Sequence, residues 1–280
     1  MTLSTSALIL AYQYYRVNER DPAREARQAE VDQCLFNNIM FGFFAEIHLL
    51  LESQEDCDAA LGVLGRVRAA FAVDDNGGEE GAGTKEDLTE RVFISLLGRR
   101  FRFSDGFSVT PRHSVDKAII VVVNGDIYFE NVGTLASLGE RQFAAISRWE
   151  SLNGGDACLV NGPENTQDTW ACRYPVCPSL VATLSFPQGH WHCENRIVFE
   201  AHKAGYTLCN PCDSVKTIHL HKDEYRTIGY HSSIYTAGPY GAVVMSSIDG
   251  PDAYKDAGWY RTDTQTPCFC TSCNGGLAGR

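Results

Sequence analysis

A carboxylate follows closely after the most apolar run of the sequence. The run is the six residues 118–123, and Asp126 comes three positions later, behind Asn124 and Gly125. An uninterrupted run rich in β-branched residues is typical of a strand buried on both faces, as in a parallel sheet. In open α/β sheets, ligands bind outside the carboxyl ends of the strands. Asp126 is therefore a candidate ligand for a hard divalent cation that bridges phosphate oxygens, although a carboxylate that only caps a turn fits the same pattern.

Two histidines offer the ligand type that suits a transition metal. His219 and His221 are two positions apart in 215–221, where alternating residues predict a strand. Both side chains should therefore point to one face. Neutral imidazoles on one face suit Mn²⁺ or Zn²⁺. A histidine that only hydrogen-bonds a nearby loop fits the same spacing.

Two carboxylates and two tryptophans are candidates for acting on a substrate. Glu194 falls in the first turn of a predicted helix over 192–204, where the helix dipole favours a carboxylate whatever its use. Asp168 lies in a predicted loop section, and a general base there would have to reach a hydroxyl directly or through one water. Trp149 and Trp170 also fall in predicted loops. Exposed aromatic rings beside carboxylates suit the faces of sugars, and they suit core packing equally.

The cysteines raise the question of zinc. The chain has 11 of them, including Cys209 and Cys212 and a late group at Cys268, Cys270 and Cys273. The local spacings are compatible with zinc, but nothing in the sequence joins the two groups. An odd number of cysteines in a chain of this size, with no secretion signal, predicts reduced thiols in the cytosol. We expect the late group to hold no structural zinc, since three thiolates lack an evident fourth ligand.

The elements that would position these residues alternate along the first part of the chain. Strands are expected at 7–12, 46–52 and 118–123, with a helix opened by Pro22 and another over 59–71. This order predicts right-handed crossovers and an α/β fold with a mostly parallel central sheet flanked by helices. No Gly-x-Gly-x-x-Gly follows the first strand, so a dinucleotide fold of the usual kind is not expected.

The later elements are less regular, and they define the domain boundaries. A strand is expected at 142–147, followed by a loop-rich section to about residue 187. The acidic, glycine-rich segment 72–90 is predicted as a mobile surface insertion. We expect a catalytic domain over 1–230 and an irregular carboxy-terminal extension over 231–280.

Composition excludes several classes of partner. The chain has 280 residues, is 44% hydrophobic and carries a net charge of −11. Nucleic acids and anionic membranes need a basic face, so neither is expected. A phosphate-bearing ligand stays compatible with the charge, because a bound cation can reverse the local field. No stretch approaches the ~20 apolar residues that span a bilayer, and the first residues lack the basic start of a signal peptide. We expect a cytoplasmic protein.

Six short segments occur in a characteristic order. They are Arg-Phe-Arg-Phe-Ser-Asp (100–105), Asn-Gly-Asp-Ile-Tyr-Phe (124–129), Ser-Arg-Trp-Glu (147–150), Gln-Asp-Thr-Trp (167–170), Glu-Asn-Arg (194–196) and Asn-Pro-Cys-x-x-x-Lys-Thr-Ile-His-Leu-His (210–221). Together they resemble a group of small nucleotide-sugar glycosyltransferases with the A-type, Rossmann-like fold, found among bacteria, algae and large algal viruses. The resemblance covers residues 7 to about 226.

The resemblance implies metal-dependent transfer of a sugar from a nucleoside-diphosphate sugar to an acceptor hydroxyl of a glycan. In such enzymes an Asp-x-Asp element ends a central strand, and its last carboxylate holds the metal. Asn124-Gly125-Asp126 matches only that last position, although Asn124 can still donate to a hydroxyl. The resemblance implies that Mn²⁺ or Mg²⁺ is held by Asp126 with His219 or His221.

The remaining candidates divide into residues that would bind the donor, act as the base or bind the acceptor. The ends of the first two strands, with Gln13, Tyr14 and Glu52, match where the donor's base and ribose lie. Glu194 matches the carboxylate that serves as base in inverting members, and Asp168 is the second candidate for that role. We expect Trp149, Asp168 and Trp170 to bind and position the acceptor.

Two other functions fit the same residues. A metal-dependent hydrolase would use Asp126, His219 and His221 around an activated water, and it would need no nucleotide. A non-catalytic nucleotide-sugar-binding protein would explain the asparagine at position 124, where the transferases carry the first aspartate.

Overall fold

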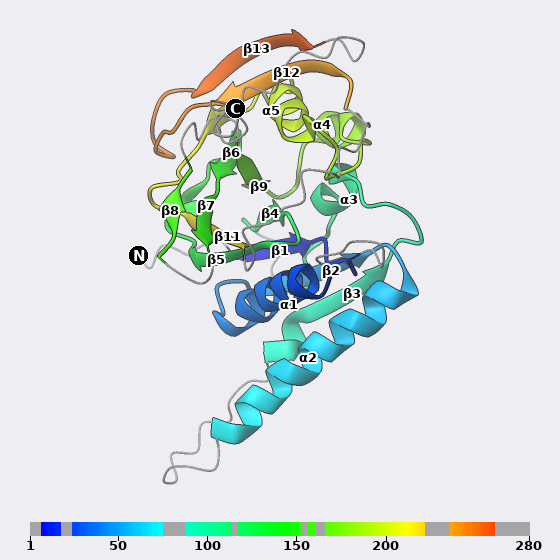
Figure 1. Ribbon diagram of the computed structural model, residues 1–280. Helices are drawn as coiled ribbons and strands as arrows, with labels where there is room; N and C mark the ends of the chain where they lie inside the picture. Colours follow the sequence, from blue (N-terminus) through cyan, green and yellow to red (C-terminus); the bar gives the residue numbers. More distant parts are fainter. Residues whose placement is uncertain are drawn as a thin grey trace, which may run out of the picture.

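The computed structural model describes residues 7–17, 24–74, 88–113, 117–152, 156–160, 166–221 and 236–260. A seven-stranded sheet lies between two groups of helices (Figure 1). In sheet order its strands are β10 (Thr207–Cys209), β6 (Gln142–Ser147), β9 (Gln167–Arg173), β4 (Ile119–Val123), β1 (Leu8–Tyr12), β2 (Glu46–Leu51) and β3 (Val92–Leu96). Among these described strands β9 alone runs against the others. The predicted α/β fold is confirmed, and its sheet is mixed, because a strand replaces the loop expected at β9.

Alternate residues of the central strands enter two separate apolar cores. The helices are α1 (Arg24–Met40), α2 (Gln54–Asp74), α3 (Phe103–Phe107), α4 (Pro178–Thr183) and α5 (Cys193–Lys203), with 3-10 helices η1 (Leu88–Arg91) and η2 (Leu135–Ser137). Along β1, Leu8 and Leu10 pack into a core with α1 and α2. Ile9 faces the other way, into a core with α3, α4 and α5. Helices on both faces (Figure 1) explain why the central strands are apolar throughout.

The strand order creates a topological switch point between β1 and β4. From β1 the chain builds outward to β2 and β3, and it then returns to the other side of β1 as β4. Tyr12 at the end of β1 is in register with Val123 at the end of β4, so the loops after both strands leave the same edge. Gly125 allows these loops to touch, because a Cβ there would lie 2.3 Å from the carbonyl oxygen of Gln13. Ligands of open α/β sheets bind in such a crevice.

A smaller sheet extends from the end of β4. In sheet order its strands are β5 (Ile127–Asn131), β11 (Lys216–His221), β7 (Trp149–Leu152) and β8 (Cys158–Leu159). His219 of β11 is in register with Ile127 of β5 on one side and with Glu150 of β7 on the other. This sheet therefore brings residues distant in sequence to the edge where β4 ends.

The described part of the carboxy-terminal extension forms a β-hairpin. Its strands β12 (Gly238–Val243) and β13 (Tyr254–Tyr260) are antiparallel and lie beside α5 (Figure 1). Asn195 of α5 donates from Nδ2 to the carbonyl oxygen of Gly241 at 3.0 Å. The prediction of an irregular extension is wrong for these residues. Glycine and proline in β12 disturb the strand pattern, while packing on α5 still orders the hairpin.

Two further expectations concern the acidic segment 72–90 and the absence of a membrane-spanning helix. Helix α2 continues to Asp74, into the acidic segment 72–90, and residues 75–87 of that segment lie outside the described residues. Within the described part of the chain, no helix is both long enough and apolar enough to cross a membrane.

Candidate active site at the carboxyl edge of the sheet

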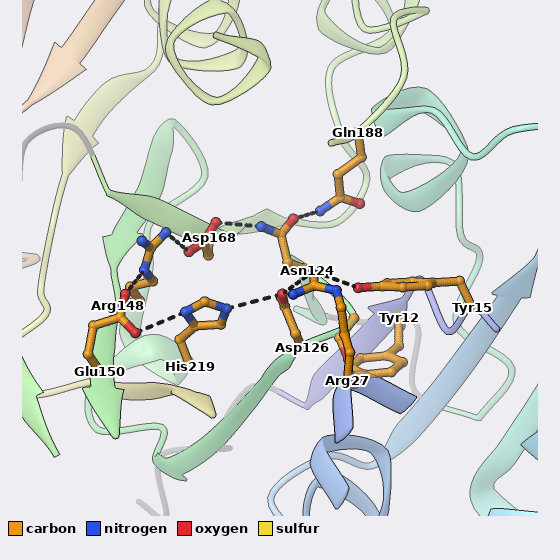
Figure 2. A network of polar contacts seen from close by, with 11 residues as sticks. Tyr12, Tyr15, Arg27, Asn124, Asp126, Arg148, Glu150, Asp168, Gln188 and His219 are labelled. Atoms are coloured by element: carbon orange, nitrogen blue, oxygen red, sulfur yellow. Dashed lines mark hydrogen bonds and ion pairs between the residues drawn. The ribbon is translucent and has the colours of Figure 1, made fainter. Parts of the chain in front are cut away.

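A connected set of polar side chains lies beyond the ends of β1 and β4 (Figure 2). At its centre, Nε2 of His219 lies 3.1 Å from Oδ2 of Asp126, and Nδ1 of the same ring lies 3.0 Å from Oε2 of Glu150. His219 is 2% exposed and Asp126 is 9% exposed, so water has little access to the pair. The structure therefore brings together two of the predicted metal ligands, Asp126 and His219.

The backbone after β4 explains why Asp126 faces His219. In the turn that follows the strand, the N–H of Ile127 donates to the carbonyl oxygen of Asn124 at 3.2 Å. The chain then enters β5 directly, and the N–H of Leu220 in β11 donates to the carbonyl oxygen of Asp126 at 3.5 Å. Main-chain contacts thus fix the carboxylate beside the strand that carries the histidine.

Arg148 connects this pair to a second carboxylate. Its guanidinium lies 2.6 Å from Oε1 of Glu150 and 2.6 Å from Oδ2 of Asp168. Asn124 donates from Nδ2 to the other oxygen of Asp168 and accepts a hydrogen bond from Nε2 of Gln188 (Figure 2). Burial opposes the charge of Arg148, but the two carboxylates outweigh it and raise the pKa of the guanidinium. Each oxygen of Asp168 thereby accepts a hydrogen bond within the protein.

Arg27 reaches the site from α1. Its Nη2 lies 3.4 Å from Oδ2 of Asp126 and 3.4 Å from the hydroxyl of Tyr15. The hydroxyl of Tyr12 donates to the carbonyl oxygen of Gly125 and so anchors the loop before Asp126. No local pattern marks Arg27, because only the packing of α1 on the sheet brings it to this edge. Arg27 was therefore not predicted as a site residue.

Arg148 and Glu150 were also missed as site residues, although the sequence carries a signal for them. They are two positions apart, and side chains at that spacing in a strand point to one face. The signal was not used because 149–152 was assigned to a loop. Gln188 lies outside any strand or helix, and no pattern in the sequence marks it.

Glu194 takes the predicted place in the first turn of α5. Its side chain keeps part of its surface exposed. Burial raises the pKa of the carboxyl to about 7, and the negative charge of Asp168 adds to the effect. Of the two candidate bases, Asp168 is bonded to Arg148 and Asn124, whereas Glu194 titrates close to neutral pH, as a general base should.

The predicted donor-side residues separate into two groups. Gln13 and Glu52 meet at the ends of β1 and β2, where Nε2 of Gln13 donates to Oε1 of Glu52 at 2.8 Å. Tyr14 points the other way, is fully buried, and donates its hydroxyl to Oδ1 of Asp32 at 2.7 Å. The assignment of Tyr14 to ligand binding is therefore wrong, because alternation after β1 turns its ring into the core. Tyr15 is the partly exposed tyrosine at this edge.

The predicted acceptor tryptophans are both in strands. Trp170 of β9 is fully buried and packs edge-to-face on Phe103, with ring centroids 4.9 Å apart. It offers no face to a sugar, so its predicted acceptor role is wrong. Trp149 of β7 donates from Nε1 to the carbonyl oxygen of Cys212 at 3.0 Å, and Nζ of Lys216 lies 5.0 Å from its ring. Alternation places this ring on the face of β7 opposite Glu150, away from the polar set.

The other predicted ligands fall partly outside the described region. His221 ends β11, as the pattern predicted, but its side chain is not among those described. Cys209 and Cys212 are buried thiols, and burial raises the pKa of Cys209 to about 12 and that of Cys212 to about 11. Residues 261–280, with the late cysteines, lie outside the described residues.

Asp126 and His219 fit a divalent metal as a pair. In the described part of the chain, no group of three or more His, Cys, Asp and Glu side chains is arranged to hold a metal. The pair nevertheless has suitable donors. The 3.1 Å between Oδ2 and Nε2 is a hydrogen-bond distance, and it is also close to the spacing of about 3.0 Å between two neighbouring ligands at ~2.1 Å from an octahedral ion. Glu150 on Nδ1 would orient the ring for Nε2 coordination, as carboxylates do in metal sites.

Comparison with known proteins adds no identification. No protein-family model matches this chain, and no curated protein matches it.

Proposed function

We propose that this protein is a metal-dependent glycosyltransferase. It would move a sugar from a nucleoside-diphosphate sugar to an acceptor hydroxyl of a carbohydrate, on an A-type fold with Mn²⁺ or Mg²⁺. The observation that carries the proposal is the contact of Asp126 with His219, at the switch point between β1 and β4. A carboxylate and an imidazole at that edge can hold a metal where a diphosphate would lie.

The donor side has the polar groups that a nucleotide requires. Glu52 follows directly after β2, a position from which an acidic residue hydrogen-bonds ribose hydroxyls in related α/β folds. Gln13 lies 2.8 Å from it and can offer an amide to the base. Arg27 lies beside Asp126, where its charge would face a phosphate.

A bound metal ion would act as a Lewis acid that stabilises the departing diphosphate. Within the protein, Asp126 and His219 would hold the ion. The positive charge of Arg27 would neutralise part of the negative charge of the diphosphate. Glu150 would fix the imidazole through Nδ1. Arg148 is bonded to Glu150 on the donor side and to Asp168 on the acceptor side. It would hold these two carboxylates at a fixed distance, so that the orientation of donor and acceptor contributes to the rate.

Glu194 would act as the general base. As the oxygen of the acceptor hydroxyl bonds to the anomeric carbon, the proton of that hydroxyl passes to the carboxylate of Glu194. The bond from the anomeric carbon to the phosphate oxygen breaks, and its electron pair leaves with the nucleoside diphosphate. Glu194 suits this role because its pKa of about 7 leaves a large ionised fraction at neutral pH. Asp168 would bind and orient the acceptor.

The same pair of residues favours one rival, a metal-dependent hydrolase that needs no nucleotide. In that case the imidazole between two carboxylates would activate a water. The third possible function is a binding protein without catalysis. Asn124 hydrogen-bonds Asp168 and Gln188, so an asparagine at this position has a structural role that requires no catalysis.

One product assay separates these functions. The purified protein would be incubated with Mn²⁺, a panel of nucleoside-diphosphate sugars and a panel of mono- and disaccharide acceptors, and the products would be resolved by mass spectrometry. We expect acceptor-dependent release of nucleoside diphosphate together with a product heavier by one sugar. Sugar released only to water, at a rate that no acceptor raises, would favour the hydrolase. Binding without turnover of any donor would favour the binding protein.

A further inference from the structure

Arg27 contacts one oxygen of the proposed metal pair. Its Nη2 lies 3.4 Å from Oδ2 of Asp126, and Nε2 of His219 lies 3.1 Å from the same oxygen. The hydroxyl of Tyr15 is a second partner of Nη2, also at 3.4 Å. Figure 2 shows the guanidinium group and the imidazole on opposite sides of the Asp126 carboxylate. Oδ2 therefore lies between a histidine that can bind a metal ion and a cation that would repel one.

The packing of α1 places Arg27 at this carboxylate. Val31, four residues further along the helix, is fully buried in the core that α1 shares with the sheet. Side chains four residues apart lie on the same face of a helix, so Arg27 extends from the buried face, one turn nearer the start of α1. Its side chain is 29% exposed and that of Asp126 is 13% exposed. Solvent and salt therefore screen these two charges only in part.

A divalent ion bound to this pair would lie close to a permanent positive charge. An ion at ~2.1 Å from Oδ2 would lie within about 5.5 Å of Nη2, because Oδ2 and Nη2 are 3.4 Å apart. An arginine side chain is not deprotonated in proteins. Two cations at such a separation repel each other strongly where water has little access. Arg27 should therefore weaken the binding of a metal ion that arrives alone.

A diphosphate would change this repulsion into attraction. Its oxygens can contact the ion and the guanidinium group together, and the forked N–H donors of arginine match phosphate oxygens. Both contacts of Arg27 Nη2 are long, at 3.4 Å, whereas Arg148 lies 2.6 Å from each of its two carboxylates. A small movement of the Arg27 guanidinium would therefore exchange Asp126 for a phosphate, while Arg148 stays fixed.

We propose that Arg27 makes tight binding of the metal ion depend on the diphosphate. When no diphosphate is bound, Arg27 neutralises Asp126 and the ion binds weakly. When a diphosphate binds, Arg27 contacts a phosphate instead, and the ion binds tightly. The two ligands are therefore coupled through one side chain. The inference rests on the proposed function, because it takes the diphosphate of the sugar donor as the second ligand.

The test measures two affinities by calorimetry, for Mn²⁺ alone and for the Mn²⁺ complexes of UDP and GDP. Arg27→Gln and Arg27→Ala remove the charge. Both variants should bind Mn²⁺ alone at least about tenfold more tightly than the wild type, and the preferred nucleotide complex at least about tenfold more weakly. Arg27→Lys keeps the charge, so it should bind Mn²⁺ alone as weakly as the wild type does. In the control Arg66→Gln, which removes an arginine that pairs with Asp32 instead of Asp126, both affinities should stay within about twofold of wild type.

The opposite signs of the two changes decide the test. Loss of affinity for both ligands in the two neutral variants would overturn the proposal, because an arginine that only supports the structure gives that result. Unchanged affinity for Mn²⁺ alone, beside tight binding of a nucleotide complex to the wild type, would overturn the coupling and leave the transferase proposal standing. If the wild type binds no Mn²⁺ with or without nucleotide, both proposals fail, because Asp126 and His219 then hold no metal.

Discussion

Replacing Glu194 by glutamine should make the protein more stable and much less active. The substitution keeps the shape of the side chain and removes its charge. A carboxyl that burial and Asp168 hold at a pKa of about 7 carries a charge at neutral pH that the folded state disfavours. A general base contributes about 10²–10⁴-fold to the rate, so we expect transfer to fall by at least about a hundredfold with donor affinity unchanged.

The size of the stability effect follows from the pKa. The ordinary value is 4.5 and the folded value is about 7, so the native state binds the proton more tightly between those values. Stability should therefore fall as pH rises through that window. At ~1.4 kcal/mol per pKa unit the difference amounts to about 3 kcal/mol, an upper bound because water still reaches part of the side chain. Glu194→Gln should raise the free energy of unfolding by up to that amount above pH 7 and leave it unchanged below pH 4.5.

Two measurements check this prediction. Urea unfolding of wild type and Glu194→Gln should show a stabilisation that is largest at pH 8, much smaller at pH 5 and absent at pH 4. The wild-type turnover rate should fall about tenfold per pH unit below pH 7, because the base becomes protonated. Full activity in Glu194→Gln, beside an inactive Asp168→Asn, would refute the assignment and give the role to Asp168.

Three further substitutions test other parts of the site. Glu150→Gln should weaken Mn²⁺ binding about 10–100-fold in calorimetry, since it changes the partner of His219 Nδ1; unchanged affinity would mean that Glu150 does not orient the ring. Trp170→Ala should cost about 3–5 kcal/mol in urea unfolding, because the ring is fully buried; a small loss would contradict its core role. Tyr14→Phe should cost about 1 kcal/mol through its lost bond to Asp32 and leave nucleotide affinity unaltered, and a weakened affinity would return Tyr14 to the binding site.

Residues marked by strong local patterns were predicted correctly. The six apolar residues before Asn124 indicated a strand covered on both faces, and the polar group after such a strand has to lie at the edge of the sheet. The alternation before His219 predicted its strand in the same way. The contact between Asp126 and His219 was not deducible from these patterns, because it depends on how β5 and β11 pair.

The errors come from polar residues that only tertiary contacts explain. β9 begins Gln167-Asp168-Thr169, and all three are buried, so the apolar signal of a strand is missing and Trp170 was assigned to a loop. Tyr14 was assigned to ligand binding together with Gln13, although adjacent residues of an extended chain point to opposite sides. Arg27 belongs to a helix whose own pattern says nothing about the sheet edge that it reaches.

The most direct test of the metal site is electron paramagnetic resonance of Mn²⁺ added with a nucleoside diphosphate. We expect one bound ion per chain, with magnetic coupling to phosphorus of the nucleotide and to a nitrogen nucleus of the protein. The nitrogen coupling should disappear in His219→Ala, and binding of the ion should be lost in Asp126→Asn. An ion that stays free in solution, or a nitrogen coupling that survives in His219→Ala, would contradict the assignment of Asp126 and His219 as the metal pair.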